Sequence, residues 1–250
     1  MKSLLCFSHP NYNLNMYRID SKVTTSTCDN TGKLKLFSAF QMMQDCSELW
    51  VKSEPKLCSY FRDANHTQLL AFRQVEVERV PDFGEDLHTE TSVYEVKPMF
   101  GFRNTFIYDS SNKPCYRTWS MGAFVDRSNG ALIRMPQEVM DSIYMEEKKP
   151  MNYLPRRIMV PRVELKPYTP FRVGKNDIDY NGHMNNANYI RMAEELRPDD
   201  FQVGVVRIEF RMPAKLHDEI TPFVLQDGSK FYVQLMLGNN VSTLIEYTSK

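Results

Sequence analysis

The amino-terminal half of the chain has the hydrophobic spacing of a helix followed by several strands. Apolar residues between positions 37 and 50 recur at steps of three and four, which places them along one face of a helix. Ser38 is the expected cap of that helix. The segments that follow are rich in β-branched and aromatic residues and partly alternate between apolar and polar positions, as strands do. The helical positions are Phe37, Phe40, Met43, Cys46, Leu49 and Trp50, and the strand segments cover residues 69–80, 89–99, 104–111 and 115–130.

The carboxy-terminal part of the chain repeats this order of elements. A short strand is expected around residues 171–173, and a helix follows from about Asn186 to Leu196, where Arg197 and Pro198 end it. A weak internal repeat agrees with this order. Its members are Arg79, Pro81 and Asp86, which have the same mutual spacing as Arg211, Pro213 and Asp218. The later strands are expected at residues 203–211, 221–226, 230–237 and 241–247.

A connecting segment separates the two repeated parts. It contains the run EEKKPMNYLPRRIMVPR, which carries three prolines, both charge signs and little periodicity. We therefore expect one unit at residues 1–140, a connection at 141–165 and a second unit at 166–250. In each unit an antiparallel sheet buries one face against the apolar stripe of a long helix, which is an α+β arrangement. Two such units form a pseudo-dimer within one chain.

Charge and composition exclude several classes of protein. The 250 residues carry 31 basic and 31 acidic side chains, and this balance argues against a nucleic-acid partner, whose binding requires many phosphate contacts. No stretch approaches the ~18 apolar residues that a membrane span needs, and residues 1–13 have too short an apolar run for a secretory signal. A cytoplasmic protein is expected. The five cysteines are odd in number and scattered, which favours free thiols, and the histidines lack the spacing of a metal site.

The residues that suggest chemistry gather in one polar segment, 176–190. Asp179, Asn181 and His183 are two apart, so an extended loop would project their side chains to the same side. His183 has the only side chain of the three that ordinarily titrates near neutral pH, which suits a general base. Asn185 or Asn186 would cap the helix that follows, and the N–H groups at its start suit an oxyanion. The alternative interpretation is an ordinary turn and helix cap.

The complete pattern resembles the active-site motif of the acyl-acyl-carrier-protein thioesterases, which release fatty acids in plants and bacteria. Members of that family consist of two tandem hotdog folds, each a long helix wrapped by an antiparallel sheet. This agrees with the repeated order of elements found above. The motif reads Asp179, Asn181, His183, Asn185, Asn186 and Tyr189, and further similar segments are Gln44 with Asp45, residues 75–85, a turn at residues 100–103, and residues 117–120.

The resemblance implies a role for each half of the chain. Asp179, Asn181 and His183 match the catalytic Asp, Asn and His of the family, and no cofactor is implied. The family's further carboxylate is expected on the strand after the second helix, where Pro213 stands, and the next position, a cysteine in some plant members, is Ala214. Proline cannot act as an acid or a base. The amino-terminal half has no such motif, and its expected role is to hold the acyl chain.

The implied activity is hydrolysis of a fatty acyl thioester on acyl carrier protein, with that carrier protein as the partner. Two alternatives remain: an acyl-CoA thioesterase, and a catalytically weak acyl-binding protein, which Pro213 would suggest. A homodimer is one of the assemblies that the sequence leaves open. An acidic carrier protein calls for a basic surface. The candidates for that surface are Lys148, Lys149, Arg156, Arg157, Arg191 and Arg197.

Overall fold

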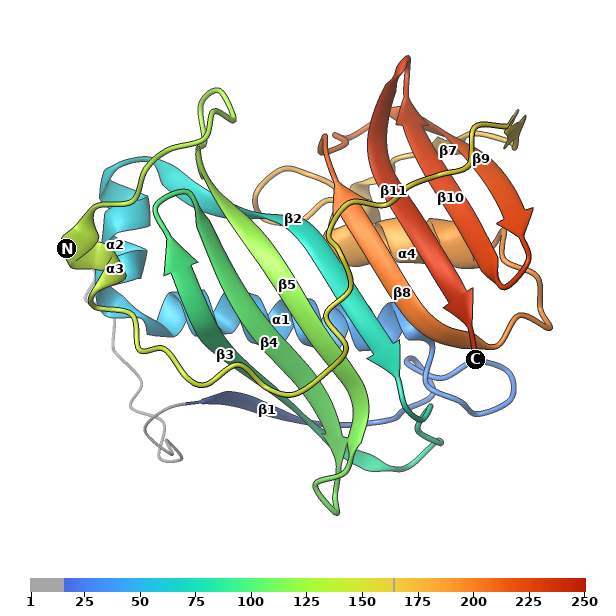
Figure 1. Cartoon of the computed structure of the whole chain (residues 1–250), viewed down its shortest axis with the longest axis horizontal. Helices are drawn as coiled ribbons and strands as arrows, with labels where there is room; N and C mark the ends of the chain where they lie inside the picture. Colours follow the sequence, from blue (N-terminus) through green and yellow to red (C-terminus); the bar gives the residue numbers. More distant parts are fainter. Residues whose placement is uncertain (1–15, 164) are drawn as a thin grey trace.

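The computed structural model describes residues 16–163 and 165–250, and in it the described residues form one 11-stranded antiparallel sheet with helices packed on one face (Figure 1). The expectations for residues 1–13 and Cys6 lie outside the described residues. The first half contains β1 (Tyr17–Lys22), α1 (Leu36–Ser53), α2 (Pro55–Asp63), β2 (His66–Val77), β3 (Asp86–Lys97), β4 (Phe100–Asp109), β5 (Pro114–Asp126) and α3 (Gln137–Met140). The second contains β6 (Lys166–Pro167), β7 (Phe171–Arg172), a 3-10 turn (Lys175–Asp177), α4 (Asn186–Glu194), β8 (Val203–Phe210), β9 (Glu219–Asp227), β10 (Lys230–Leu237) and β11 (Asn240–Ser249).

The strand order confirms that the chain consists of two similar units. The first unit has the order β1-β3-β4-β5-β2, and the second has β8-β11-β10-β9, with the short strands β6 and β7 both paired to β9. Counted outward from the β2–β8 junction, the strands follow in equivalent order in the two units: β2, β5, β4 and β3 in the first, and β8, β11, β10 and β9 in the second. The two sheets join where β2 pairs with β8 in antiparallel register, and Gln74 opposite Arg207 is the centre of that pairing.

The structure corrects the internal repeat that the sequence suggested. The Leu34 N–H donates to the Pro81 carbonyl at 2.8 Å, and the Met184 N–H donates to the Ala214 carbonyl at the same distance. Pro81 is thus equivalent to Ala214 and not to Pro213. The proposed match was one residue out of register, because three shared residue types are too few to fix an alignment.

The core lies between the helices and the inner face of the sheet. On α1, Phe40, Met43 and Cys46 are buried, as their spacing predicted. Tyr189 and Ile190 on α4 pack into the same cluster as Phe40 and Met43. Burying each of these large side chains contributes roughly 1.5–3 kcal/mol. No helix among the described residues is long and apolar enough to cross a membrane. Cys28, Cys46, Cys58 and Cys115 are free thiols.

Several local expectations were wrong. Ser38 lies inside α1, whose cap position is Lys35, and Leu49 is 41% exposed because it turns away from the sheet. Helix α2 was missed, since Pro55 reads as a breaker although proline is favoured in the first helical turn. The expected turn at residues 100–103 is the start of β4, and the chain reverses at Pro98 and Met99 instead.

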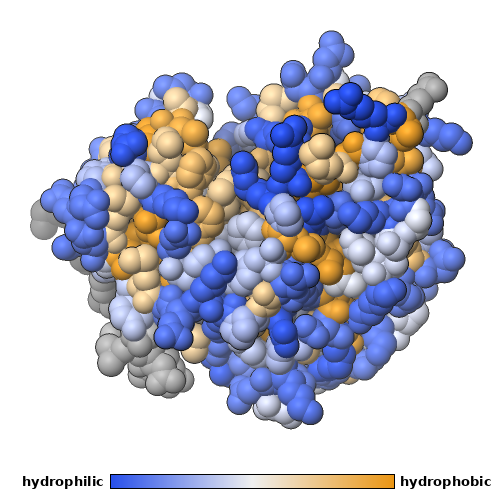
Figure 2. Space-filling model, in the orientation of Figure 1, coloured by the Kyte–Doolittle hydropathy of each residue, from blue (hydrophilic) through white to orange (hydrophobic). Residues whose placement is uncertain are grey.

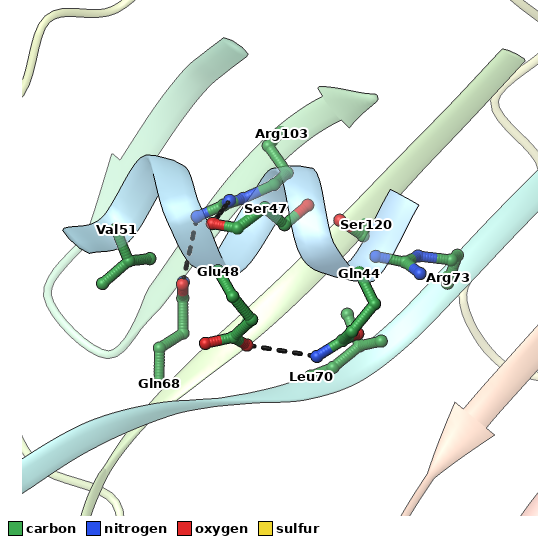
Figure 3. A pocket seen from close by; sticks show the side chains of 10 residues that line it. Gln44, Ser47, Glu48, Val51, Gln68, Leu70, Arg73, Arg103 and Ser120 are labelled. Carbon is green, nitrogen blue, oxygen red and sulfur yellow. Dashed lines mark hydrogen bonds between the residues drawn. The ribbon is translucent and has the colours of Figure 1, made fainter. Parts of the chain in front are cut away.

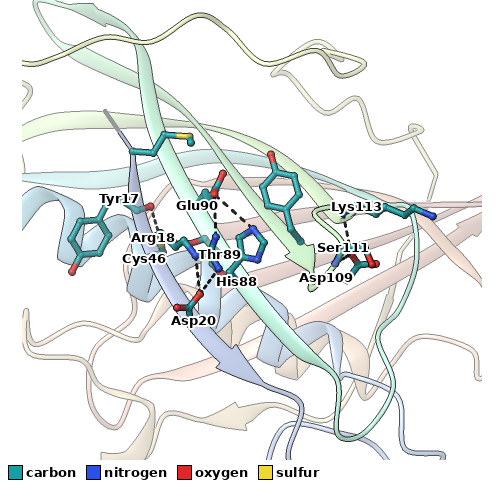
Figure 4. Close-up of polar contacts among 12 residues, drawn as sticks. Tyr17, Arg18, Asp20, Cys46, His88, Thr89, Glu90, Asp109, Ser111 and Lys113 are labelled. Carbon is teal, nitrogen blue, oxygen red and sulfur yellow. Dashed lines mark hydrogen bonds and ion pairs between the residues drawn. The ribbon is translucent and has the colours of Figure 1, made fainter. Parts of the chain in front are cut away.

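Strand β1 is held at the edge of the sheet by contacts to both α1 and β3 (Figure 4). The Cys46 thiol lies 3.6 Å from the Tyr17 carbonyl and 3.4 Å from the Thr89 carbonyl. Burial raises the pKa of this thiol to about 12, so it remains protonated at neutral pH. On the outer side of β1, Arg18 contacts Asp20 at 2.8 Å. Cys46 is therefore a packing residue, as its place on the apolar stripe indicates.

The connecting segment crosses the face of the sheet opposite to α1 and α4 (Figure 1). This face of the molecule presents mainly hydrophilic residues with apolar patches between them (Figure 2). The Arg207 guanidinium donates to the Pro155 carbonyl at 2.7 Å, and the Glu209 carboxylate accepts from the Ile158 N–H. Glu209 consequently anchors the connection on the outer face.

Candidate active site

The segment from Ile178 to Met184 forms a tight turn and not the extended loop that the sequence suggested. Ile178 and Met184 pair as an isolated bridge, and the Asp179 N–H donates to the His183 carbonyl at 2.8 Å. The Asp179 carboxylate accepts the Asn181 N–H at 2.8 Å. Gly182 has a φ of 77°, a left-handed conformation that glycine adopts without steric cost. Side-chain alternation along an extended strand therefore does not apply here.

The turn leads directly into α4, which Asn185 caps as expected. Its side-chain oxygen accepts the Ala187 N–H at 2.9 Å, and its own N–H donates to the Asp177 carbonyl at 2.8 Å. The Asp177 carboxylate in turn contacts Arg191 at 2.6 Å. Within the described part of the chain, the Asn186 N–H donates no hydrogen bond. The helix start thus keeps one N–H group available to a ligand.

His183 is half-buried at the end of this turn. Among residues 16–163 and 165–250, its imidazole makes no hydrogen bond, so both ring nitrogens are open to water or substrate. Asp179 and Asn181 share the turn with His183, but their side chains do not contact its ring in this structure. The three predicted residues are therefore brought together by the backbone and not by a hydrogen-bonded side-chain network.

Two contacts attach the turn to the amino-terminal unit. The Tyr180 hydroxyl donates to the Glu48 carboxylate on α1 at 2.8 Å. The Arg127 guanidinium donates to the Asn181 side-chain oxygen at 3.2 Å and to the His66 carbonyl at 3.1 Å. Glu48, Tyr180 and Arg127 were missed by sequence reasoning, because each contact joins positions far apart along the chain. The candidate active site therefore lies at the junction of the two units.

Comparison with known proteins identifies the family. Residues 14–143 match the family described as acyl-ACP thioesterase N-terminal domain, and residues 173–250 match the thioesterase-like superfamily. The chain belongs to the acyl-ACP thioesterase family. It is accordingly assigned to the thioester hydrolases. No curated protein sequence matches the chain significantly.

Solved structures of acyl-ACP thioesterases have the same fold. The acyl-ACP thioesterase from Bacteroides thetaiotaomicron aligns with a TM-score of 0.82 at 18% identity, over 94% of this chain and 98% of its own. The 12:0-ACP thioesterase from Umbellularia californica aligns with a TM-score of 0.84 at 15% identity, over 97% of this chain and 99% of its own. The expected pair of tandem hotdog folds is confirmed.

Pro213 lies next to the turn that contains His183, although not on a strand. Strand β8 ends at Phe210, and Pro213 is exposed in the loop that follows. The Ala214 carbonyl accepts the Met184 N–H at 2.8 Å, and the Ala214 N–H donates to the Tyr189 hydroxyl at 2.9 Å. The residue before Ala214 is thus close to the residue that follows His183, where a carboxylate would be well placed.

Three of the six residues expected to form the basic surface pair with neighbouring carboxylates, and a fourth, Lys148, lies 3.5 Å from the centre of the Tyr153 ring. Arg191 pairs with Asp177, Arg197 contacts Glu194 at 3.1 Å, and Lys149 contacts Glu90 at 3.4 Å. The remaining arginines, Arg156 and Arg157, are exposed on the connecting segment and form no ion pair with any described residue.

A small cavity lies between α1 and the sheet of the amino-terminal unit, which was expected to hold an acyl chain. Its volume is about 30 Å³. Phe40, Met43 and Trp50, which belong to the apolar stripe of α1, are buried in the core. The lining is mostly polar and consists of Gln44, Ser47, Glu48, Val51, Gln68, Leu70, Arg73, Arg103, Ser120 and Gly122 (Figure 3).

Proposed function

We propose that the protein hydrolyses the thioester between an acyl group and acyl carrier protein and releases the free acid. The observation that carries this proposal is the open imidazole of His183, held in a tight turn directly before the start of α4. A general base must be free to receive a proton, and a helix start supplies N–H groups for developing negative charge. Membership of the acyl-ACP thioesterase family supports the choice of substrate.

The proposed reaction needs a single attack by water. His183 accepts a proton as the water oxygen bonds to the thioester carbonyl carbon, and the carbonyl oxygen becomes an oxyanion. The N–H of Asn186 stabilises that oxyanion. When the carbon–sulfur bond breaks, the imidazolium of His183 returns its proton to the departing thiolate. Arg127 occupies the side-chain oxygen of Asn181, which leaves the amide group of Asn181 to orient the water by donating a hydrogen bond.

We assign Asp179 a positioning role. Its carboxylate accepts the Asn181 N–H and its backbone pairs with His183, so it fixes the shape of the turn. Arg156 and Arg157, which carry unpaired positive charge, are the proposed contact for the acidic carrier protein.

The test compares His183→Ala with Lys33→Ala. Lys33 occupies the corresponding position in the turn before α1, where its side chain contacts Asp82 at 2.6 Å on the surface. Loss of a general base typically lowers the rate by about 10²–10⁴-fold. We expect that loss in kcat for His183→Ala with acyl-ACP, and near-normal turnover for Lys33→Ala. A folded His183→Ala enzyme with normal kcat would show that another group is the base. Faster turnover of acyl-CoA than of acyl-ACP would show that the carrier is wrong.

A further inference from the structure

Two buried arginines flank the small cavity, with a serine between them. Arg103 on β4 is opposite Ser120 on β5, and Ser120 is opposite Arg73 on β2. Because directly opposite residues on neighbouring strands share a face, all three side chains project toward α1. Neighbouring strands lie ~5 Å apart, so the small Ser120 leaves space between the two guanidinium groups.

Arg73 forms no ion pair or hydrogen bond with any described residue, and the nearby Glu48 carboxylate attracts it only at longer range. It is 2% exposed, its Nε is buried without a hydrogen bond, and no carboxylate within the described ranges forms an ion pair with it. Its guanidinium lies 5.9 Å from the centre of the Phe40 ring and points toward Ser120 and Gln44 (Figure 3). Buried charges are normally paired, since an unpaired one costs several kcal/mol. This side chain therefore has unused capacity to bind an anion.

Arg103 differs from Arg73, because the protein itself occupies its donors. Its guanidinium donates to the Ser47 carbonyl at 3.0 Å and to the Gln68 side chain at 3.2 Å, and it stacks 4.6 Å from the centre of the Trp50 ring. Arg103 thus supplies fixed positive charge at the far side of the cavity, while Arg73 retains free donors.

The single carboxylate in the lining does not balance both arginines. Glu48 accepts from the Gln44 amide at 3.1 Å and from the Tyr180 hydroxyl at 2.8 Å, and it forms an ion pair with neither arginine. Two positive charges and one negative charge leave a net charge of about +1 around the cavity. The Tyr180 contact also places this lining residue directly beside the catalytic turn.

Two glycines make room for the Gln68 side chain, which lines the cavity. Gly101 and Gly122 are opposite one another on β4 and β5, and a Cβ atom at Gly122 would lie only 2.4 Å from the Gln68 amide nitrogen. Water needs roughly 10–15 Å³ by the same measure of volume, so about 30 Å³ accommodates a group of a few atoms and not a long hydrocarbon chain.

We propose that this cavity binds a carboxylate group through the guanidinium of Arg73. A carboxylate is a small, planar monoanion, and it matches the paired donors of an arginine. A methyl end of an acyl chain would leave Arg73 unpaired. The inference also rests on the proposed function in one respect: where the carboxylate is the far end of the acyl group, thioesters of ω-carboxyacyl groups become the preferred substrates. A free carboxylate is the other source of the same chemistry.

The first experiment measures kcat/KM for acyl carrier protein loaded with saturated acyl groups and with ω-carboxyacyl groups of equal length, from short to long. Wild-type enzyme should favour the carboxylated member of the best pair by about 10- to 100-fold, the range expected of hydrogen bonds to a charged group. Arg73→Met should abolish that preference, and Arg73→Lys should retain part of it. Arg117→Met serves as the control, since Arg117 contacts Glu78 at the surface of β5. It should behave as wild type.

The second experiment titrates acetate into wild-type protein and Arg73→Met by calorimetry. If wild type binds acetate and Arg73→Met does not, the cavity is supported as a carboxylate site. If that binding occurs without any preference for carboxylated substrates, the ligand is a free carboxylate and not the end of an acyl group. Failure of wild type to hydrolyse any thioester would refute the proposed function, while the titration would still test the cavity. Absence of both acetate binding and substrate preference in folded wild type overturns the inference. Neither wild-type measurement depends on whether Arg73→Met folds.

Discussion

Replacing Arg73 with methionine should make the protein more stable. Burial, together with the nearby charge of Arg103, lowers the pKa of Arg73 to about 9. The folded state therefore holds the proton less tightly than the unfolded state. At neutral pH, well below both pKa values, the buried charge lowers the free energy of unfolding by its full amount. At about 1.4 kcal/mol per pKa unit, this cost is on the order of 4–5 kcal/mol.

Methionine has a similar length and no charge, and its sulfur can remain against the Phe40 ring. Part of the gain is lost with the cation–π contact, which is worth roughly 0.5–2 kcal/mol. We therefore expect Arg73→Met to raise the free energy of unfolding by about 1–4 kcal/mol, the range found when buried charges are replaced by apolar side chains.

Arg207→Met is the matched control on the neighbouring strand. Arg207 is also buried, but it contacts the Glu246 carboxylate at 2.6 Å, and Glu246 is 2% exposed. Its removal leaves the buried Glu246 carboxylate with the half-exposed Lys230 at 3.2 Å as its remaining ion-pair partner among the described residues, and should cost about 3–5 kcal/mol. The two variants thus delete the same side-chain type with opposite expected signs.

Thermal unfolding at neutral pH measures both changes. For a chain of this size, 1 kcal/mol corresponds to roughly 2–4 °C in Tm, so Arg73→Met should raise Tm by several degrees and Arg207→Met should lower it by about 10 °C. A decrease in Tm for Arg73→Met comparable to that of the control would mean that Arg73 stabilises the fold. The argument for its unused binding capacity would then be refuted.

Three further predictions concern the proposed active site and the carrier protein. Arg127→Met should lower kcat by about 10-fold with little change in Tm, because it frees the Asn181 side chain from a charge-assisted hydrogen bond, and an unchanged kcat would show that this contact is incidental. Pro213→Glu should turn over faster than Pro213→Ala, and equal rates in two folded variants would remove position 213 from the chemistry. Replacing Arg156 and Arg157 with glutamate should raise KM for acyl-ACP and not for acyl-CoA; equal effects on both would exclude this surface.

Local patterns in the sequence predicted most of the elements. The predicted span of β10, residues 230–237, agrees with the observed strand, and the Asn185 cap places the start of α4 correctly, because turn and cap residues act on their immediate neighbours. The pairing of β2 with β8 could not be predicted in this way. It depends on two faces meeting in the folded chain, and no spacing along the sequence specifies which strands become neighbours.

For the candidate site, too, residues close in sequence could be predicted and contacts between distant residues could not. The resemblance identified Asp179, Asn181 and His183, which are close in sequence, but not the contacts of Tyr180 with Glu48 or of Asn181 with Arg127. The polar cavity was also not predicted. Its arginines and serine are spread over three strands, and only the register of those strands brings them together.

The turn before α1 has the same backbone conformation as the candidate turn before α4. Asp29 accepts the Thr31 N–H at 2.8 Å, its N–H donates to the Lys33 carbonyl at 2.8 Å, and Gly32 has a φ of 80°. The second unit has the same contacts between Asp179 and Asn181 and between Asp179 and His183, and Gly182 has the same left-handed φ. The backbone and the aspartate are thus common to both turns, so an aspartate in this place needs no catalytic explanation.

The difference between the two turns lies in their other side chains. Where the second turn has the imidazole of His183, the first has the side chain of Lys33. Where the second turn has Asn185 as a helix cap, the first has Lys35, whose side chain makes no capping hydrogen bond and brings positive charge to an already positive helix start. The proposed base, His183, and an uncharged cap, Asn185, therefore distinguish the second turn on a backbone that both units possess.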